Sequence, residues 1–231
     1  MTYFPIGAKI NLEENFSTFE NNGFFGWLRN GEDFDPQSIA ELEIFSVHSG
    51  ARSGKYFVKL LRREETQNKG LPERFINSLL CDLVIDRKYG KTNVFMPRPV
   101  GLVYSGNWAE MLKGDSKSYF IADLIEGKTL LHIWERLNNE KRRKILGRLS
   151  IPLNFFRDEG IYPLDSAPRD IVLKQGEYPV IVDTEHLLIN GGGKNKEYLK
   201  EQIAQFKEDY GLFLEGNDLE KAVEIVFGAA E

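Results

Sequence analysis

Short apolar runs separated by turn residues fill the first half of the chain and predict strands. Residues 1–42 are rich in Asn, Gly and Phe with several turn signals, which predicts strands without readable boundaries. Two apolar runs, 42–47 and 55–61, flank the turn-forming residues 49–54 and predict a β-hairpin. The apolar run at 119–127 predicts a further strand.

Apolar residues at helical spacing become frequent after this hairpin and dominate the second half of the chain. Pro72 stands at the first turn of an amphipathic helix, and Thr129 can cap a short one. A longer helix contains Pro152, which predicts a bend. The expected helices cover residues 72–84, 130–137, 140–158, 199–210 and a last segment that begins near Asn217 or Asp218.

Three aspartates surround a second predicted hairpin, at residues 171–182. Asp165 and Asp170 precede its first strand, and Asp183 follows its second strand. Because antiparallel strands fold back on each other, all three carboxylates can converge at one end of the hairpin. Mg²⁺ in proteins is commonly held by one or two carboxylates together with substrate phosphates. The spacing therefore indicates a divalent-metal site used in phosphoryl transfer.

This stretch resembles the catalytic and metal-binding segments of protein-kinase-like folds, in which an aspartate and an asparagine five residues later precede a hairpin and D-F-G. Asp165 matches the catalytic-loop aspartate, Asp170 the metal-binding asparagine and Asp183 the D-F-G aspartate. The sequence departs from the family pattern at Pro163, where the family has histidine, at Asp170, and at Thr184-Glu185, where it has Phe-Gly.

The resemblance extends to the first half of the chain. The run at 55–61 resembles the V-A-I-K strand, which implies that Lys59 reaches the α- and β-phosphates. In the family an acid on the next helix pairs with this lysine; Asp82 is the expected partner and Glu73 the alternative. The glycines of the N-terminal region lack the G-x-G-x-x-G spacing of a phosphate-binding loop.

The segment at 96–103 resembles the strand that precedes the hinge in the small lipopolysaccharide-core kinases, and 119–127 resembles the hinge. The resemblance implies that Ala122 lines the back of an adenine pocket and that the backbone from Asp123 to Ile125 reads the edge of the base. The short chain after Asp183 is similar to those kinases, to the tRNA-modification-complex kinases and to the RIO-like kinases.

The resemblance implies an α+β, two-lobed kinase-like fold: a β-sheet N-lobe over 1–125 and a reduced, mainly helical C-lobe over 126–231, which together form one domain. It implies a phosphotransferase that uses ATP and Mg²⁺ or Mn²⁺, with Lys59 and Asp165 as catalytic residues. The γ-phosphate acceptor is a hydroxyl of a glycan, a small molecule or a protein Ser/Thr. The alternative is a pseudokinase that binds nucleotide or serves as a scaffold.

Composition and charge limit the partners, the cellular location and the metal sites that the sequence allows. The formal charge of −5 argues against nucleic acid as a partner, and no apolar run is long enough for a membrane span. The single cysteine, Cys81, excludes an intramolecular disulfide, so we expect a cytoplasmic location. The three histidines, His48, His132 and His186, are scattered, which argues against zinc.

Overall fold

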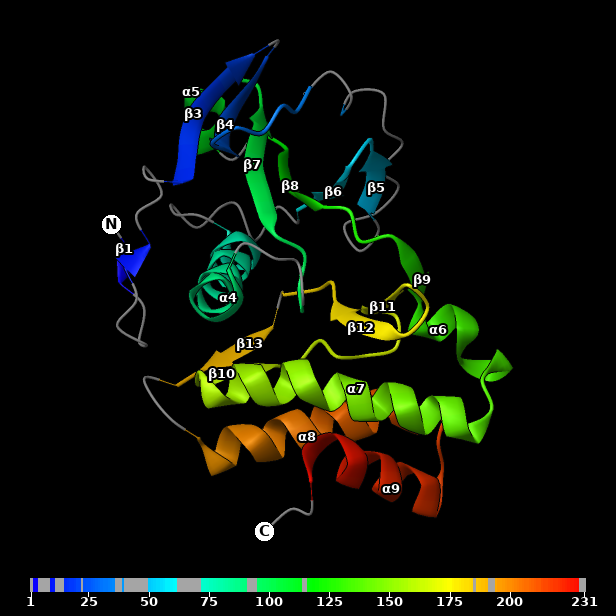
Figure 1. Cartoon of the computed structure of the whole chain (residues 1–231). Helices are drawn as coiled ribbons and strands as arrows, with labels where there is room; N and C mark the ends of the chain where they lie inside the picture. Colours follow the sequence, from blue (N-terminus) through cyan, green and yellow to red (C-terminus); the bar gives the residue numbers. More distant parts are fainter. Residues whose placement is uncertain are drawn as a thin grey trace. The chain divides into compact units, whose positions relative to one another are not determined.

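The computed structural model describes residues 2–3, 9–10, 15–21, 23–35, 39, 50–61, 72–90, 95–113, 116–184, 186–190 and 194–228. The chain divides into two compact units. The first comprises Met1–Thr2, Lys9–Asn93 and Pro97–Leu124, and the second comprises Tyr3–Ala8, Val94–Met96 and Ile125–Glu231. Figure 1 labels most of the elements of both units. The first two elements are short paired strands, β1 (Thr2–Tyr3) and β2 (Lys9–Ile10).

A six-stranded antiparallel sheet forms the first unit. Its strands follow the order β3-β4-β7-β8-β6-β5. Their bounds are Phe16–Asn21 for β3, Phe24–Arg29 for β4, Gly50–Ser53 for β5, Tyr56–Leu60 for β6, Pro99–Ser105 for β7 and Ser118–Asp123 for β8. Because β7 and β8 lie between β4 and β6, two strands separate the N-terminal glycines of the β3–β4 hairpin from the strand that carries Lys59.

Close packing of β4 against β7 requires a glycine at position 26. Its φ is +151°, and a Cβ atom there would lie 2.1 Å from the carbonyl oxygen of Leu102. Any larger residue at position 26 would push β4 away from β7. Gly26 is therefore a structural glycine of the sheet and no part of a phosphate-binding loop.

The hairpin expected from 42–47 and 55–61 differs in its first strand and in its turn. β6 pairs with β5, in the register Gly50↔Lys59 to Ser53↔Tyr56. The turn is the two residues Gly54 and Lys55, and Gly54 supplies the positive φ of +56° that a tight hairpin turn needs. Residues 42–47 lie outside the described residues.

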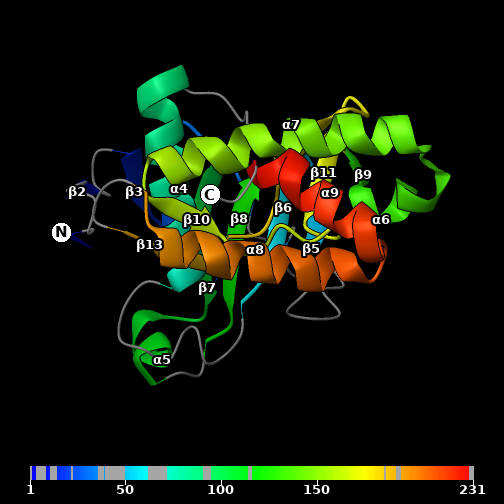
Figure 2. The same cartoon turned by 90° about the horizontal axis from the view of Figure 1, so that it is seen from below.

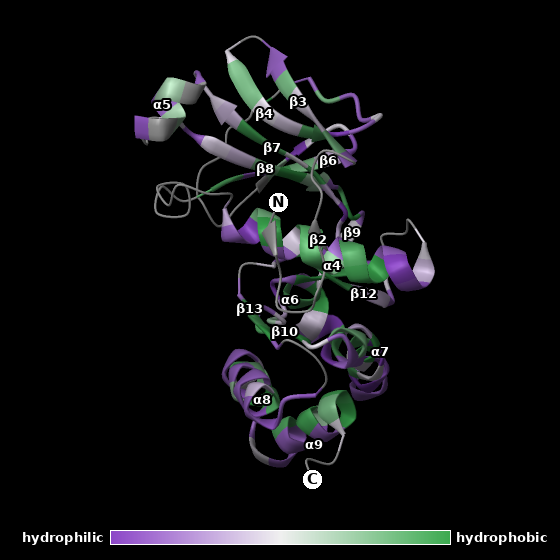
Figure 3. Ribbon diagram, turned by 90° about the vertical axis from the view of Figure 1, so that its left-hand side faces the viewer, coloured by the Kyte–Doolittle hydropathy of each residue, from purple (hydrophilic) through white to green (hydrophobic). Residues whose placement is uncertain are grey.

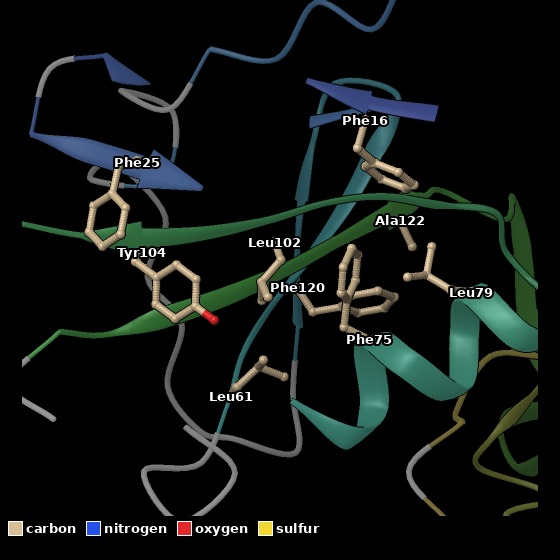
Figure 4. Close-up of a cluster of buried hydrophobic side chains, with 9 residues drawn as sticks. All are labelled: Phe16, Phe25, Leu61, Phe75, Leu79, Leu102, Tyr104, Phe120 and Ala122. Carbon is tan, nitrogen blue, oxygen red and sulfur yellow. The ribbon is translucent and has the colours of Figure 1, made fainter. Parts of the chain in front are cut away.

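Helix α4 (Glu73–Tyr89) packs against one face of this sheet, and Pro72 is its N-cap, as expected for its start. Figure 4 shows Phe75 and Leu79 of α4 directed toward side chains of the strands. Each fully buried Phe or Leu contributes about 1.5–3 kcal/mol. The cluster consists of Phe16, Phe25, Leu61, Phe75, Leu79, Leu102, Tyr104, Phe120 and Ala122. Cys81 is also buried in α4, and a short helix, α5 (Trp108–Lys113), follows β7.

The second unit contains two small sheets and is otherwise mainly helical. One sheet has the order β12-β11-β9 and the other pairs β10 with β13. The strands are β9 (Gly127–Thr129), β10 (Ile161–Pro163), β11 (Ile171–Lys174), β12 (Tyr178–Ile181) and β13 (Leu187–Ile189). The helices are α6 (Leu130–Ile133), the 3-10 helix η1 (Trp134–Arg136), α7 (Asn139–Asp158), α8 (Lys196–Gly211) and α9 (Gly216–Phe227).

Helix α9 packs against both α7 and α8, and the three helices run side by side in Figure 2. Figure 3 shows hydrophobic and hydrophilic residues along each of them, as expected for helices with one buried and one solvated side. The predicted cap is confirmed, because Thr129 Oγ1 accepts the N–H of His132 at 3.3 Å. The predicted α+β fold, with a sheet first and mainly helices afterwards, is also confirmed. Among the described helices, none combines the length and apolar composition of a bilayer span.

A buried carboxylate, that of Glu32, fixes one end of the first unit's sheet. Its side chain is only 8% exposed and accepts from Arg98 at 2.5 Å, from Lys55 at 2.9 Å and from the hydroxyl of Tyr56 at 2.8 Å. Arg98 also binds Asp123, at 2.9 Å and 3.2 Å. Burial raises the pKa of Glu32, but the three hydrogen bonds outweigh it and hold the pKa at about 2, below the ordinary 4.5.

We predict that Glu32→Gln lowers the free energy of unfolding by about 2 kcal/mol at pH 7, because it removes the charged acceptor of a partly buried ion pair. Since the pKa of Glu32 is lowered on folding, its stabilisation is present above pH 4.5 and disappears as the pH falls toward 2. Urea unfolding across this range measures the effect. Glu20→Gln, on an exposed position of β3, is the control; equal losses in both variants at pH 7 would contradict the prediction.

Candidate functional site

The loop that carries Asp165 begins at a fixed point of the second unit. β10 ends at Pro163, which stands opposite Leu187 of β13. The N–H of Leu164 donates to the carbonyl of His186 at 3.0 Å, which continues the pairing by one residue. The carbonyl of Pro163 accepts from the buried side chain of Gln202 on α8 at 2.8 Å. The chain just before Asp165 is therefore held from two sides.

The loop then returns to the start of the β11–β12 hairpin. The N–H of Asp170 donates to the carbonyl of Ala167, and the carbonyl of Pro168 accepts from Leu131, each at 2.8 Å. The N–H of Val182 donates to the carbonyl of Asp170, also at 2.8 Å. This last hydrogen bond joins the two ends of the hairpin, so Asp170 lies beside the segment that leads to Asp183.

The hairpin itself matches the expectation from sequence. Ile171 stands opposite Ile181 and Lys174 opposite Tyr178. The turn places Gln175 and Gly176 at φ values of 54° and 75°. Both residues belong to the three-residue loop 175–177 that joins the two strands. The antiparallel register carries Asp170 and Asp183 to the same end, away from the turn.

The electrostatics of Asp170 reflect this convergence. Its side chain is 17% exposed. Burial raises its pKa most, the negative charge of Asp183 raises it next, and that of Asp165 adds a smaller increase. Arg169, 3.3 Å away, offsets only part of this, so the pKa reaches about 7. A divalent cation would relieve the repulsion among these carboxylates, and their oxygen donors suit Mg²⁺ or Mn²⁺.

The three carboxylates do not form a closed metal cage. In the part of the chain that the structure describes, no three Asp, Glu, His or Cys side chains are grouped closely enough to hold one ion. Mg²⁺ does not need such a cage, because it retains waters and takes further oxygens from substrate phosphates. The residues present therefore fit a metal that arrives with a phosphate-bearing ligand better than a permanently bound ion.

His186 is a site residue that sequence reasoning missed. Its backbone N–H donates to Oδ2 of Asp165 at 2.7 Å, and its ring Nδ1 lies 3.1 Å from Oδ1. From the sequence, the three histidines were considered only as zinc ligands, and their scattered positions argued against that role. The position of His186 three residues after Asp183 is the only sequence signal that could have drawn attention to it.

In the first unit, the structure places Lys59 and Ala122 on the same face of the sheet. Lys59 stands opposite Phe120, and Phe57 stands opposite Ala122, in the antiparallel pair β6–β8. Residues opposite each other in such a pair share a face. Phe120 and Ala122 belong to the cluster that α4 covers, so Lys59 is on the α4 side of the sheet. Lys59 is 5% exposed and Ala122 is 1% exposed.

Asp82, the expected partner of Lys59, forms an ion pair with an arginine. Asp82 Oδ2 lies 2.5 Å from Nη2 of Arg29 on β4. Burial raises the pKa of Asp82, and Arg29 lowers it in part. Glu73, the alternative, is exposed in the first turn of α4. Asp82 instead fastens α4 to the β4 end of the sheet.

The backbone from Asp123 to Ile125, which was expected to bind the edge of the adenine base, already makes other hydrogen bonds. The N–H of Asp123 donates to the carbonyl of Arg98 at 3.0 Å, and the N–H of Leu124 donates to the carbonyl of Lys55 at 2.9 Å. The carboxylate of Asp123 is bound by Arg98. Any recognition of a base by this segment must therefore use the carbonyl groups and the N–H of Ile125.

We predict that Asp170→Asn stabilises the metal-free protein at pH 8 by roughly 2–3 kcal/mol, because it removes a buried, repelled charge at constant shape. In the wild type, the folded pKa of Asp170, about 7, lies above the ordinary 3.8. The free energy of unfolding therefore falls as the pH rises from about 4 to 7, and it stays lowered by the full amount above pH 7. The increase in the free energy of unfolding caused by Asp170→Asn should therefore be small at pH 5 and large at pH 8, as measured in chelator-treated samples.

The control is Asp158→Asn, which changes an exposed aspartate of the same unit. It should alter the melting midpoint little at either pH. An Asp170→Asn variant that is no more stable than wild type at pH 8 would contradict the proposed repulsion among the three carboxylates.

Comparison with known proteins gives structural similarity only. No protein-family model matches the sequence, and no curated protein matches it. The kinase PK-1 of Cydia pomonella granulovirus is similar in structure, with a TM-score of 0.42 and 12% identity over 77% of this chain and 53% of that one. The bifunctional kinase-methyltransferase WbdD is similar with a TM-score of 0.45 and 12% identity over 90% of this chain and 48% of that one. The chain thus spans about half the length of each.

Proposed function

We propose that this chain is an ATP-dependent phosphotransferase that transfers the γ-phosphate of ATP to a hydroxyl group. The observation that carries the proposal is the convergence of Asp165, Asp170 and Asp183 at one end of the β11–β12 hairpin. Burial and then the negative charges of Asp183 and Asp165 raise the pKa of Asp170 to about 7, and Arg169 offsets only part of this increase. A site with this imbalance favours a divalent cation and the phosphates that accompany it.

Asp170 and Asp183 would hold Mg²⁺ or Mn²⁺. When bound, the metal neutralises charge on the β- and γ-phosphates. Asp170 replaces the family's asparagine, which keeps an oxygen ligand and adds one negative charge. Lys59 would contact the α- and β-phosphates from β6. Its position on the same sheet face as Ala122 supports a common role in nucleotide binding, in which Ala122 would leave space for the adenine.

Asp165 would orient the acceptor hydroxyl and accept its proton. In the reaction the hydroxyl oxygen forms a bond to the γ-phosphorus, the bond to the β-phosphate bridging oxygen breaks, and ADP leaves with the electron pair. Asp165 is suited to this role because the backbone holds its loop on both sides while its side chain is still 21% exposed. The acceptor class, whether a glycan, a small molecule or a protein Ser/Thr, follows from none of these contacts.

A pseudokinase is the second candidate, and one observation favours it. Both carboxylate oxygens of Asp165 already have a contact with His186. If the substrate hydroxyl could not reach the remaining lone pairs, the chain would bind nucleotide without turnover. The two candidates share nucleotide binding and differ in phosphotransfer, so separate measurements of the two properties distinguish them.

Nucleotide binding is tested by thermal melting. We expect ATP with Mg²⁺ or Mn²⁺ to raise the free energy of unfolding by about 2.7 kcal/mol at a hundred times its dissociation constant. Lys59→Met should reduce this shift, whereas Lys113→Met, on the exposed end of α5, should leave it unchanged. If neither ATP nor ADP, at millimolar concentration with Mg²⁺ or Mn²⁺, raises the melting midpoint, both candidate functions fail.

Phosphotransfer is tested by following ADP release and acceptor labelling with Asp165→Asn. We expect this variant to bind ATP as wild type does and to lose at least about a hundredfold in turnover, because general-base and positioning roles are worth roughly 10²- to 10⁴-fold. Asp158→Asn is the matched control. An Asp165→Asn variant with normal turnover would remove Asp165 from catalysis, and a wild-type protein that binds ATP but never turns over would favour the pseudokinase.

A further inference from the structure

A single residue, His186, engages both oxygens of the Asp165 carboxylate. The backbone N–H is 2.7 Å from Oδ2, and the ring Nδ1 is 3.1 Å from Oδ1. A carboxylate accepts hydrogen bonds only, so Nδ1 must carry a proton for the second contact to be attractive. The ring is 62% exposed and the carboxylate 21% exposed, so the pair lies at the surface of the second unit, where a dissolved substrate can reach it.

The backbone places the histidine opposite the aspartate. The β10–β13 pairing aligns Pro163 with Leu187, and the next hydrogen bond runs from Leu164 N–H to the carbonyl of His186. His186 N–H then points at the side chain of the following residue, Asp165. This contact alone fixes one oxygen and leaves the carboxylate able to turn about its own axis. The ring contact fixes the second oxygen and therefore the plane of the group.

We propose that His186 is a positioning residue, which donates its Nδ1–H to Asp165 and sets the plane in which this carboxylate meets the acceptor hydroxyl. The inference rests on the proposed phosphotransferase function. Each carboxylate oxygen keeps a second lone pair, so these two contacts leave acceptor capacity for a substrate hydroxyl. The histidine orients the carboxylate and takes no part in bond making.

The same short segment also connects this orientation to the proposed metal ligands. His186 follows Asp183 by three residues, and Asp183 is one of the charges that raise the pKa of Asp170. A metal bound at Asp183 would therefore influence the position of the backbone at His186. Asp183 and His186 are therefore close in sequence while serving the proposed metal and base, respectively.

Two substitutions separate a donor role from other roles of the ring. His186→Asn keeps an amide N–H donor about where Nδ1 stands, at the same number of bonds from Cα, and His186→Ala removes it. We expect His186→Ala to lower kcat by roughly thirtyfold with the KM for ATP nearly unchanged, since a misplaced catalytic group can cost up to about a hundredfold. His186→Asn should stay within about threefold of wild type. His132→Ala, at an exposed position of α6, is the control.

Two outcomes of the kinetics would overturn the proposal. Full activity of His186→Ala would show that the backbone contact orients Asp165 sufficiently. Equal losses in the Ala and Asn variants would show that the ring acts through something other than its Nδ1–H, such as proton transfer at Nε2. Circular dichroism and ATP binding of each variant report whether folding and the nucleotide site survive.

A spectroscopic readout tests the pairing without turnover. In ¹⁵N-labelled protein, long-range proton–nitrogen correlations show which ring nitrogen of His186 carries the proton. We expect a protonated Nδ1 in wild type at pH 8 and loss of this preference in Asp165→Ala. An unprotonated Nδ1 in wild type would refute the pairing. A chain with no phosphotransfer activity would refute the proposed function instead, so the two failures are distinguishable.

Discussion

The antiparallel register of β11 and β12 is the constraint on which the acidic site depends. Ile171 stands opposite Ile181, and the hydrogen bond from Val182 N–H to the Asp170 carbonyl closes the end of the hairpin. Asp170 immediately precedes this pair, and Asp183 follows it by two residues. A shift of one residue would turn the buried side of β12 to the other face. The same register thus buries the apolar strand residues and brings the two carboxylates together.

Burial and the neighbouring carboxylates disfavour the charged form of Asp170. Arg169 pairs with Asp170, but its side chain is 71% exposed and therefore well screened by water. Helix packing supports the strands around this site, because α7 packs against β10 and β12 and α8 packs against β10. Functional sites commonly retain such unfavourable arrangements when a ligand relieves them. The ligand that we propose for this site is a divalent cation bound with phosphate.

Local signals predicted the second unit well, and contacts distant in sequence account for what was missed. The hairpin around Gln175 and Gly176 and the cap at Thr129 depend on neighbours in sequence, so pattern and turn chemistry sufficed. The Arg29 partner of Asp82 depends on the order of strands in the sheet, which periodicity does not encode. The contact of His186 with Asp165 likewise depends on the pairing of β10 with β13. The sequence predicted a turn at β5 because Gly50 and Ser53 have low strand propensity. Pairing with β6 outweighs this low propensity and makes the segment a strand.

The most direct test of this account is a crystal structure with Mn²⁺ and a non-hydrolysable ATP analogue, in which the anomalous signal of manganese locates the ion. The account predicts an ion bound by oxygens of both Asp170 and Asp183, at about 2.1 Å as for magnesium sites, and by phosphate oxygens. An ion bound to the nucleotide but to neither aspartate, or a nucleotide bound away from the hairpin, would contradict it.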